Sequence, residues 1–63
     1  MTSAGYLTTV EVAELCRTSP DTVRFWRYSG QGPRSFKVGR RVLYRRVDVE
    51  QWLDELHDRE GVQ

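Results

Sequence analysis

The sequence has little of what a disulfide, a metal site or a membrane span requires. Its 63 residues include one cysteine, Cys16, and one histidine, His57. A lone cysteine cannot pair within the chain, which fits a reducing cytosol, and a zinc site needs about four nitrogen or sulfur ligands. No apolar run approaches the roughly 18 residues of a membrane span, and the N-terminus lacks a secretory signal. We expect no disulfide, no metal, no membrane segment and a cytoplasmic location.

Residues for catalysis are equally scarce. The chain has no glycine-rich phosphate-binding loop and no matched pair of acid and base, so we expect neither an enzyme nor a cofactor. A chain of 63 residues forms one domain at most. Such a short chain buries only roughly 60% of the surface that its unfolded form exposes. We expect a single domain over residues 1–63, with a core at about 6–56 and a frayed tail at about 59–63.

Positive charge is concentrated in the middle of the chain, although the net charge is only +1. Residues 17–46 contain nine Arg or Lys and one Asp, which gives a net charge of +8. Residues 1–16 carry −2 and residues 47–63 carry −5. A basic stretch between acidic ends is typical of a protein that contacts a polyanion.

Two short helices are predicted on either side of a three-residue break. Thr8 and Glu11 form a capping box, in which each side chain accepts a hydrogen bond from the backbone amide of the other residue. Ser19 is an N-cap, Pro20 suits the first helical position, and Gly30 can take the left-handed conformation that ends a helix. The second helix therefore spans about 20–28. Two such helices form a helix-turn-helix, whose second helix can enter a major groove.

A hairpin and a third helix are predicted to follow. Residues 35–38 and 42–45 can pair as strands around Gly39-Arg40-Arg41, and an amphipathic helix runs from Val47 to about Asp58. The predicted fold is mostly α with a small β-hairpin, a winged helix-turn-helix in the order helix, helix, wing, helix. The residues expected to form the core are Val10, Ala13 and Leu15 or Cys16, then Val23 and Trp26, then Val49, Trp52, Leu53 and Leu56.

Three stretches resemble the excisionase-like members of the MerR winged-helix superfamily. They are residues 19–26 (SPDTVRFW), 39–41 (GRR) and 44–53 (YRRVDVEQWL), and the similarity covers roughly residues 6–56. The resemblance implies site-specific binding of double-stranded DNA, with the second helix in the major groove and the wing against a minor groove or the backbone. Two positions depart from the pattern. Arg27 stands where relatives often bury an aliphatic residue, and Val47 replaces a polar cap.

The exposed face of the second helix is the predicted reading surface. Arg24 forms a bidentate contact with guanine, contacts a phosphate, or is simply solvated. Phe25 could touch a thymine methyl, although we favour its packing against the wing. Tyr28 is expected to donate a hydrogen bond to a phosphate. Thr22 either donates to a phosphate or merely occupies the third position of its own helix. The residues predicted to bind DNA on this helix are Asp21, Thr22, Arg24, Phe25, Arg27 and Tyr28.

Cations on and beside the wing complete the predicted interface. Arg40 and Arg41 at the hairpin tip can reach into a narrow groove, and we expect at least one of them to touch DNA. The alternative is an ordinary solvated turn. The flanking cations expected to contact phosphates or to add long-range attraction are Arg34, Lys37, Arg45 and Arg46.

Three functions fit these features. The first is an excisionase, or recombination directionality factor, that bends DNA and steers a phage or plasmid integrase towards excision. The short chain favours it, because longer regulators of this superfamily carry a sensor or dimerisation region. The second is a small MerR-like transcriptional regulator, and the third is an adaptor that binds protein through Phe25 and Tyr28. We also expect a monomer in solution whose copies associate on DNA, the acidic third helix of one copy meeting the basic wing of the next.

Overall fold

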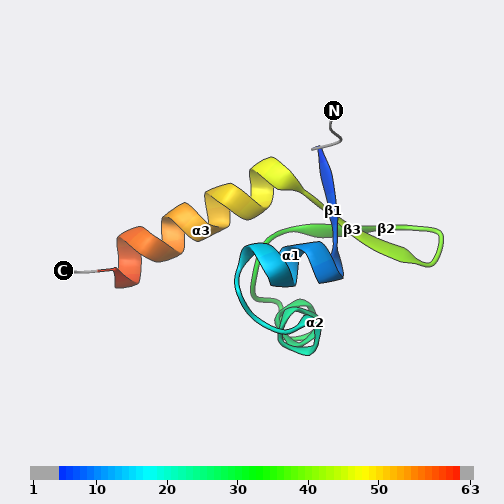
Figure 1. Cartoon of the computed structure of the whole chain (residues 1–63), viewed down its shortest axis with the longest axis horizontal. Coiled ribbons are helices and arrows are strands. Elements are labelled where there is room, and N and C mark those ends of the chain that lie inside the picture. Colours follow the sequence, from blue (N-terminus) through cyan, green and yellow to red (C-terminus); the bar gives the residue numbers. More distant parts are fainter. Residues whose placement is uncertain (1–4, 62–63) are drawn as a thin grey trace.

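Three helices and a three-stranded antiparallel sheet make up residues 5–61, the part of the chain that the computed structural model describes (Figure 1). No helix in that part is both long and apolar enough to cross a membrane. The predicted class, mostly α with a small hairpin, is confirmed. The elements are β1 (Tyr6–Thr8), α1 (Thr9–Leu15), α2 (Pro20–Tyr28), β2 (Ser35–Val38), β3 (Arg41–Arg45) and α3 (Arg46–Glu60).

Both predicted helix starts are present. The Thr8 amide donates to Glu11 Oε1 (2.8 Å), and the Glu11 amide donates to Thr8 Oγ1 (3.2 Å). Ser19 Oγ accepts from the Thr22 amide (3.2 Å), and Pro20 is the first residue of α2. These bonds satisfy backbone donors that have no partner inside a helix. The capping residues therefore fix where α1 and α2 begin.

The two helices also end in the same way, by a Schellman motif. After α1, the Thr18 amide donates to the Ala13 carbonyl (2.8 Å). The motif requires one residue with a left-handed backbone. In α2 that residue is the predicted glycine, Gly30, with φ +78°, whereas in α1 it is Arg17, with φ +60°. The turn of the helix-turn-helix thus contains a strained residue that is not glycine.

The sheet has the order β1-β3-β2, so the hairpin gains a third strand that the sequence analysis did not predict. Leu7 of β1 and Ser35 of β2 both pair with Tyr44, one from each side of β3. Alternate side chains of a strand point to opposite faces of the sheet. Tyr44 and Val42 therefore share the inner face with Leu7, while Arg41 and Arg45 lie on the outer face.

The hairpin turn is shorter than predicted. Val38 pairs with Arg41, which leaves only Gly39 and Arg40 in the loop. Gly39 has φ +62°, and Arg40 does not have a positive φ. This is the pattern of a type II′ turn, whose twist matches that of the strands. The prediction that Arg41 lies at the tip is therefore wrong, since Arg41 is the first residue of β3.

The core lies between the inner face of the sheet and the three helices. The prediction for α1 is wrong in part, because Val10 and Leu15 are 49% and 36% exposed while Val12 is fully buried. Leu7 precedes the N-cap and is buried with Val12, the fourth helical residue, and this hydrophobic staple sets the rotation of the helix. The buried residues are Leu7, Val12, Ala13, Val23, Tyr44 and Val49. The half-buried residues against them are Cys16, Trp26, Val42 and Leu53.

The third helix begins one residue earlier and ends about two residues later than predicted. It starts at Arg46, with no side-chain cap, and continues to Glu60. The expected frayed tail is thus helical at Arg59 and Glu60, since no helix-breaking residue precedes Gly61. Its last two residues, 62 and 63, lie outside the described part.

Helix α3 is joined to α2 by an aromatic pair. The rings of Trp26 and Trp52 lie 4.9 Å apart between centroids, with a tilt of 50°. Val49 is fully buried, and Trp52, Leu53 and Leu56 are half-buried, as expected of the apolar stripe. Beyond this anchor α3 projects away from the sheet (Figure 1). Its C-terminal end and the hairpin tip stand at opposite ends of the longest dimension, 41 Å. This arrangement is a winged helix-turn-helix.

Candidate nucleic-acid interface

Helix α2 presents an open face of polar and aromatic side chains. Phe25 is 63% exposed and Tyr28 is 85% exposed. The expectation that Phe25 packs against the wing is therefore wrong. Its position on α2 turns the ring towards solvent, whereas the buried positions of this helix are taken by Val23 and, in part, by Trp26. Aromatic rings this exposed are available to a partner.

Arg24 and Asp21 form an ion pair one turn apart on this face. Arg24 Nη1 lies 2.9 Å from Asp21 Oδ1, and the two side chains are 55% and 94% exposed. An exposed pair of this kind adds little to stability, about 0–1 kcal/mol. The pair holds the Arg24 guanidinium beside Asp21, so the role of Asp21 on this face is to position Arg24.

The other two predicted residues of α2 make contacts within the protein. Thr22 Oγ1 lies 3.0 Å from Ser19 Oγ, so its hydroxyl takes part in capping its own helix. Arg27 Nε donates to Ser35 Oγ (3.1 Å) at the start of β2. Arg27 therefore does not fill the place of a buried aliphatic residue, but reaches across from α2 to the sheet.

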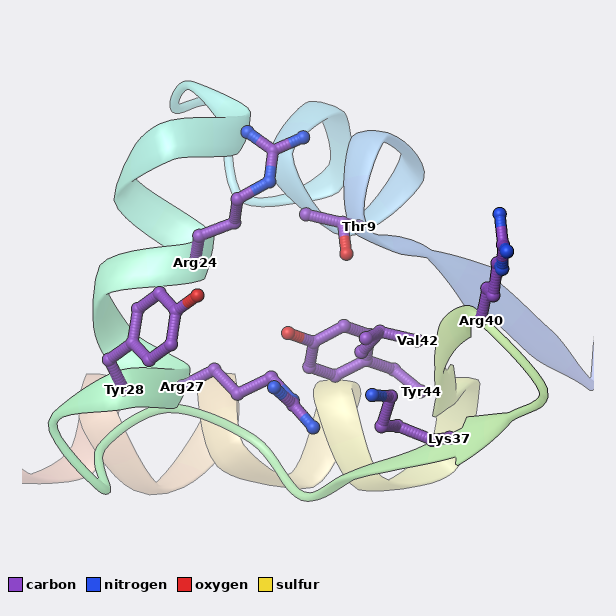
Figure 2. Close-up of a pocket in the computed structure, with 8 residues that line it drawn as sticks. All are labelled: Thr9, Arg24, Arg27, Tyr28, Lys37, Arg40, Val42 and Tyr44. Atoms are coloured by element: carbon purple, nitrogen blue, oxygen red, sulfur yellow. The ribbon is translucent and has the colours of Figure 1, made fainter.

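A hollow of about 240 Å³ lies between α2, the start of α1 and the hairpin (Figure 2). We call it the basic hollow, because four of its lining residues are Arg or Lys and none is Asp or Glu. It brings together predicted residues that are up to sixteen positions apart, from Arg24 to Arg40. The lining residues are Thr9, Arg24, Arg27, Tyr28, Lys37, Arg40, Val42 and Tyr44.

Tyr44 is a residue of the hollow that the sequence analysis missed. Its ring is 1% exposed, in the core, while the residue also lines the hollow. Burial raises the pKa of Tyr44, although the charge of Arg27 and a hydrogen bond with the Thr9 side chain act to lower it. The two-residue alternation with Val42 was the available signal, but it was obscured by the arginines that follow.

The remaining predicted cations are not brought together. Arg41 and Arg45 lie on the outer face of β3, across the sheet from Tyr44. Arg46 forms an ion pair with Glu50, with Nε and Oε2 3.0 Å apart. Arg34 lines a separate hollow beside α3, which also contains Asp48 and Glu55. Of the wing and flanking residues, Lys37 and Arg40 alone join α2 at the basic hollow.

A helix pair whose second helix exposes arginine and aromatic side chains, next to a hairpin that adds further cations, defines a winged helix-turn-helix domain suited to a nucleic acid. The helix-turn-helix domain family matches residues 6–57, and the chain belongs to this family. This membership supports DNA as the partner. Neither a curated protein nor a solved structure matches the chain.

Proposed function

We propose that the chain is a non-enzymatic architectural protein that binds specific sites in double-stranded DNA, an excisionase that steers a phage or plasmid integrase towards excision. The observation that carries the DNA-binding part is the continuous surface formed by the open face of α2 and the basic hollow. The excisionase part rests on the resemblance of residues 19–26, 39–41 and 44–53 to that branch of the MerR superfamily.

In this proposal α2 enters the major groove and the hairpin follows the adjacent backbone or minor groove. Arg24, oriented by Asp21, reads a base edge, and Phe25 contacts a thymine methyl. Contacts to phosphate position the domain without reading sequence. The groups proposed for phosphate contact or long-range attraction are Thr22, Arg27, Tyr28, Arg34, Lys37, Arg40, Arg41, Arg45 and Arg46.

Selection of binding sites from random duplexes tests the specific-binding part. A single enriched motif is expected, and recovery of unrelated sequences would contradict it. An excision assay then separates excision from transcriptional regulation. The purified protein is added to an integrase encoded by a neighbouring gene and to DNA that carries the integrated element, and it should increase the yield of excised element. Promoter repression without any effect on excision would instead identify a MerR-like regulator.

The charge distribution also favours assembly on DNA. The hairpin and the acidic part of α3 stand at opposite ends of the molecule, so one copy can meet the next head to tail. On the outer face, Arg41 and Arg45 are exposed, and Asp54, Glu55 and Asp58 are exposed on α3. Such contacts are weak alone, but DNA holds neighbouring copies at a high effective concentration.

We expect a monomer in sedimentation of the free protein, and cooperative binding with bending on a duplex that carries adjacent sites. Reversal of charge at Asp54 and Asp58 should remove the cooperativity but keep the affinity for a single site. A tight dimer without DNA would favour the regulator. Independent binding to adjacent sites would contradict assembly.

A further inference from the structure

Three hydroxyl groups face the basic hollow from three different elements. Thr9 at the start of α1, Tyr28 on α2 and Tyr44 on β3 each direct a hydroxyl oxygen towards the same space in Figure 2. The Tyr28 side chain is largely exposed, whereas Tyr44 is fixed by the core that surrounds its ring. A hydroxyl held in this way loses little conformational entropy when it binds a ligand.

The cations of the hollow are poorly neutralised. Arg24 is paired with Asp21, but within residues 5–61 no carboxylate lies within 4.0 Å of Arg27, Lys37 or Arg40. The partner of Arg27 is the neutral hydroxyl of Ser35. Ammonium and guanidinium groups only donate hydrogen bonds, so the complementary ligand is an anion with several acceptor oxygens.

Tyr44 is equipped to donate to such an anion. Burial is the largest influence on its pKa and raises it, so the hydroxyl keeps its proton at neutral pH. The charge of Arg27, which lines the same hollow, opposes this rise in the pKa. The hollow measures about 240 Å³. Since a water occupies about 30 Å³ in the liquid, a phosphate group fits together with several waters.

We propose that the basic hollow binds one phosphate group of the DNA backbone, where the strand passes from α2 to the hairpin, with Lys37 and Arg27 supplying charge and the Tyr44 hydroxyl donating a hydrogen bond. The inference rests on the proposed DNA-binding function and adds to it one phosphate-binding site and one hydrogen-bond donor, the hydroxyl of the buried Tyr44. Its position between helix and wing would fix the angle at which α2 enters the groove.

Neutral backbone linkages test this assignment. Affinity is measured for duplexes in which each phosphate in turn is replaced by a methylphosphonate, with the wild type and with the variants Tyr44→Phe and Lys37→Gln. Tyr6→Phe is the matched control, because Tyr6 lies on the outer face of the sheet against Phe36. Arg59→Gln on α3 controls for the loss of one positive charge.

At the linkage that lies in the basic hollow, we expect neutralisation to weaken wild-type binding about tenfold, the effect of losing a hydrogen bond to a charged group. Tyr44→Phe and Lys37→Gln should each weaken binding to the unmodified duplex, and each should lose clearly less than tenfold at that linkage, because part of the contact is already gone. The controls should retain the full tenfold loss. If the loss of affinity caused by a variant and the loss caused by neutralising a linkage were independent at every linkage, while the wild type still bound its site specifically, the phosphate site in the hollow would be overturned and the proposed function would stand. Absence of specific wild-type binding would overturn both.

A free phosphate ion is the other source of the same chemistry. Inorganic phosphate is titrated into the DNA-free protein and followed by heteronuclear NMR. A seat built for the DNA backbone should bind the ion weakly, with shifts confined to the hollow and reduced in Tyr44→Phe. Tight saturation by inorganic phosphate, with no linkage coupled to Tyr44, would assign the hollow to a free ion and contradict the proposal.

Discussion

The turn between α1 and α2 offers a stability prediction of defined size, because Arg17 holds a left-handed backbone with φ +60°. This conformation costs a residue other than glycine about 1–2 kcal/mol. Replacement by glycine removes that cost but adds up to about 1 kcal/mol, since glycine loses more entropy on folding. Arg17 is exposed, so its replacement opens no cavity. We expect Arg17→Gly to raise the free energy of unfolding by about 0.5–1 kcal/mol and the Tm by about 2–8 °C.

Urea and thermal unfolding of three variants separate backbone strain from the loss of charge. Arg17→Ala removes the guanidinium but keeps the left-handed backbone, so it should not stabilise the protein. Gly30→Ala imposes the same strain on the matching motif of α2, where an added Cβ would meet no atom within 4 Å. It should destabilise the protein by about 1 kcal/mol. Equal stability of Arg17→Gly and Arg17→Ala would refute the strain argument.

Two further predictions concern the reading helix and the loop behind it. Arg24→Ala should lose discrimination between the selected site and random DNA, whereas Arg40→Ala should weaken binding to both alike, since a hairpin cation meets backbone or a degenerate groove; equal losses for Arg24→Ala on specific and random duplexes, measured by fluorescence anisotropy, would be inconsistent with base reading. Gly32→Ala should destabilise the protein, because a Cβ would stand 2.9 Å from Trp26 Cβ and Gly32 has φ +81°; a Tm equal to that of the wild type in a thermal melt would show that the Trp26 contact yields freely.

The parts of the fold that were predictable are those specified by neighbouring residues. Thr8 with Glu11, and Ser19 with Pro20, fixed the helix starts because a cap acts within one turn. Gly30 marked the end of α2 for the same reason. The missed strand β1 has no such local signal. Its three residues become a strand only by pairing with β3, some 37 positions later in the register of Leu7 with Tyr44.

The candidate site was predictable as a set of cations but not as a shape. Composition placed the positive charge in residues 17–46, yet the face taken by each arginine depends on the length of the hairpin loop. A loop shorter by one residue moved Arg41 to the outer face, because a shift of one position reverses every side chain of a strand. Tyr44 escaped notice for a related reason, since its burial comes from both neighbouring strands.

The salt dependence of DNA affinity tests most directly whether α2 and the basic hollow bind the DNA backbone. If about four to eight phosphates are contacted, log K should fall against log salt with a slope of about −4 to −7, because each neutralised phosphate releases counterion. Lys37→Gln should reduce the magnitude of that slope by about 1. A slope near zero for the wild type would contradict DNA binding through this surface.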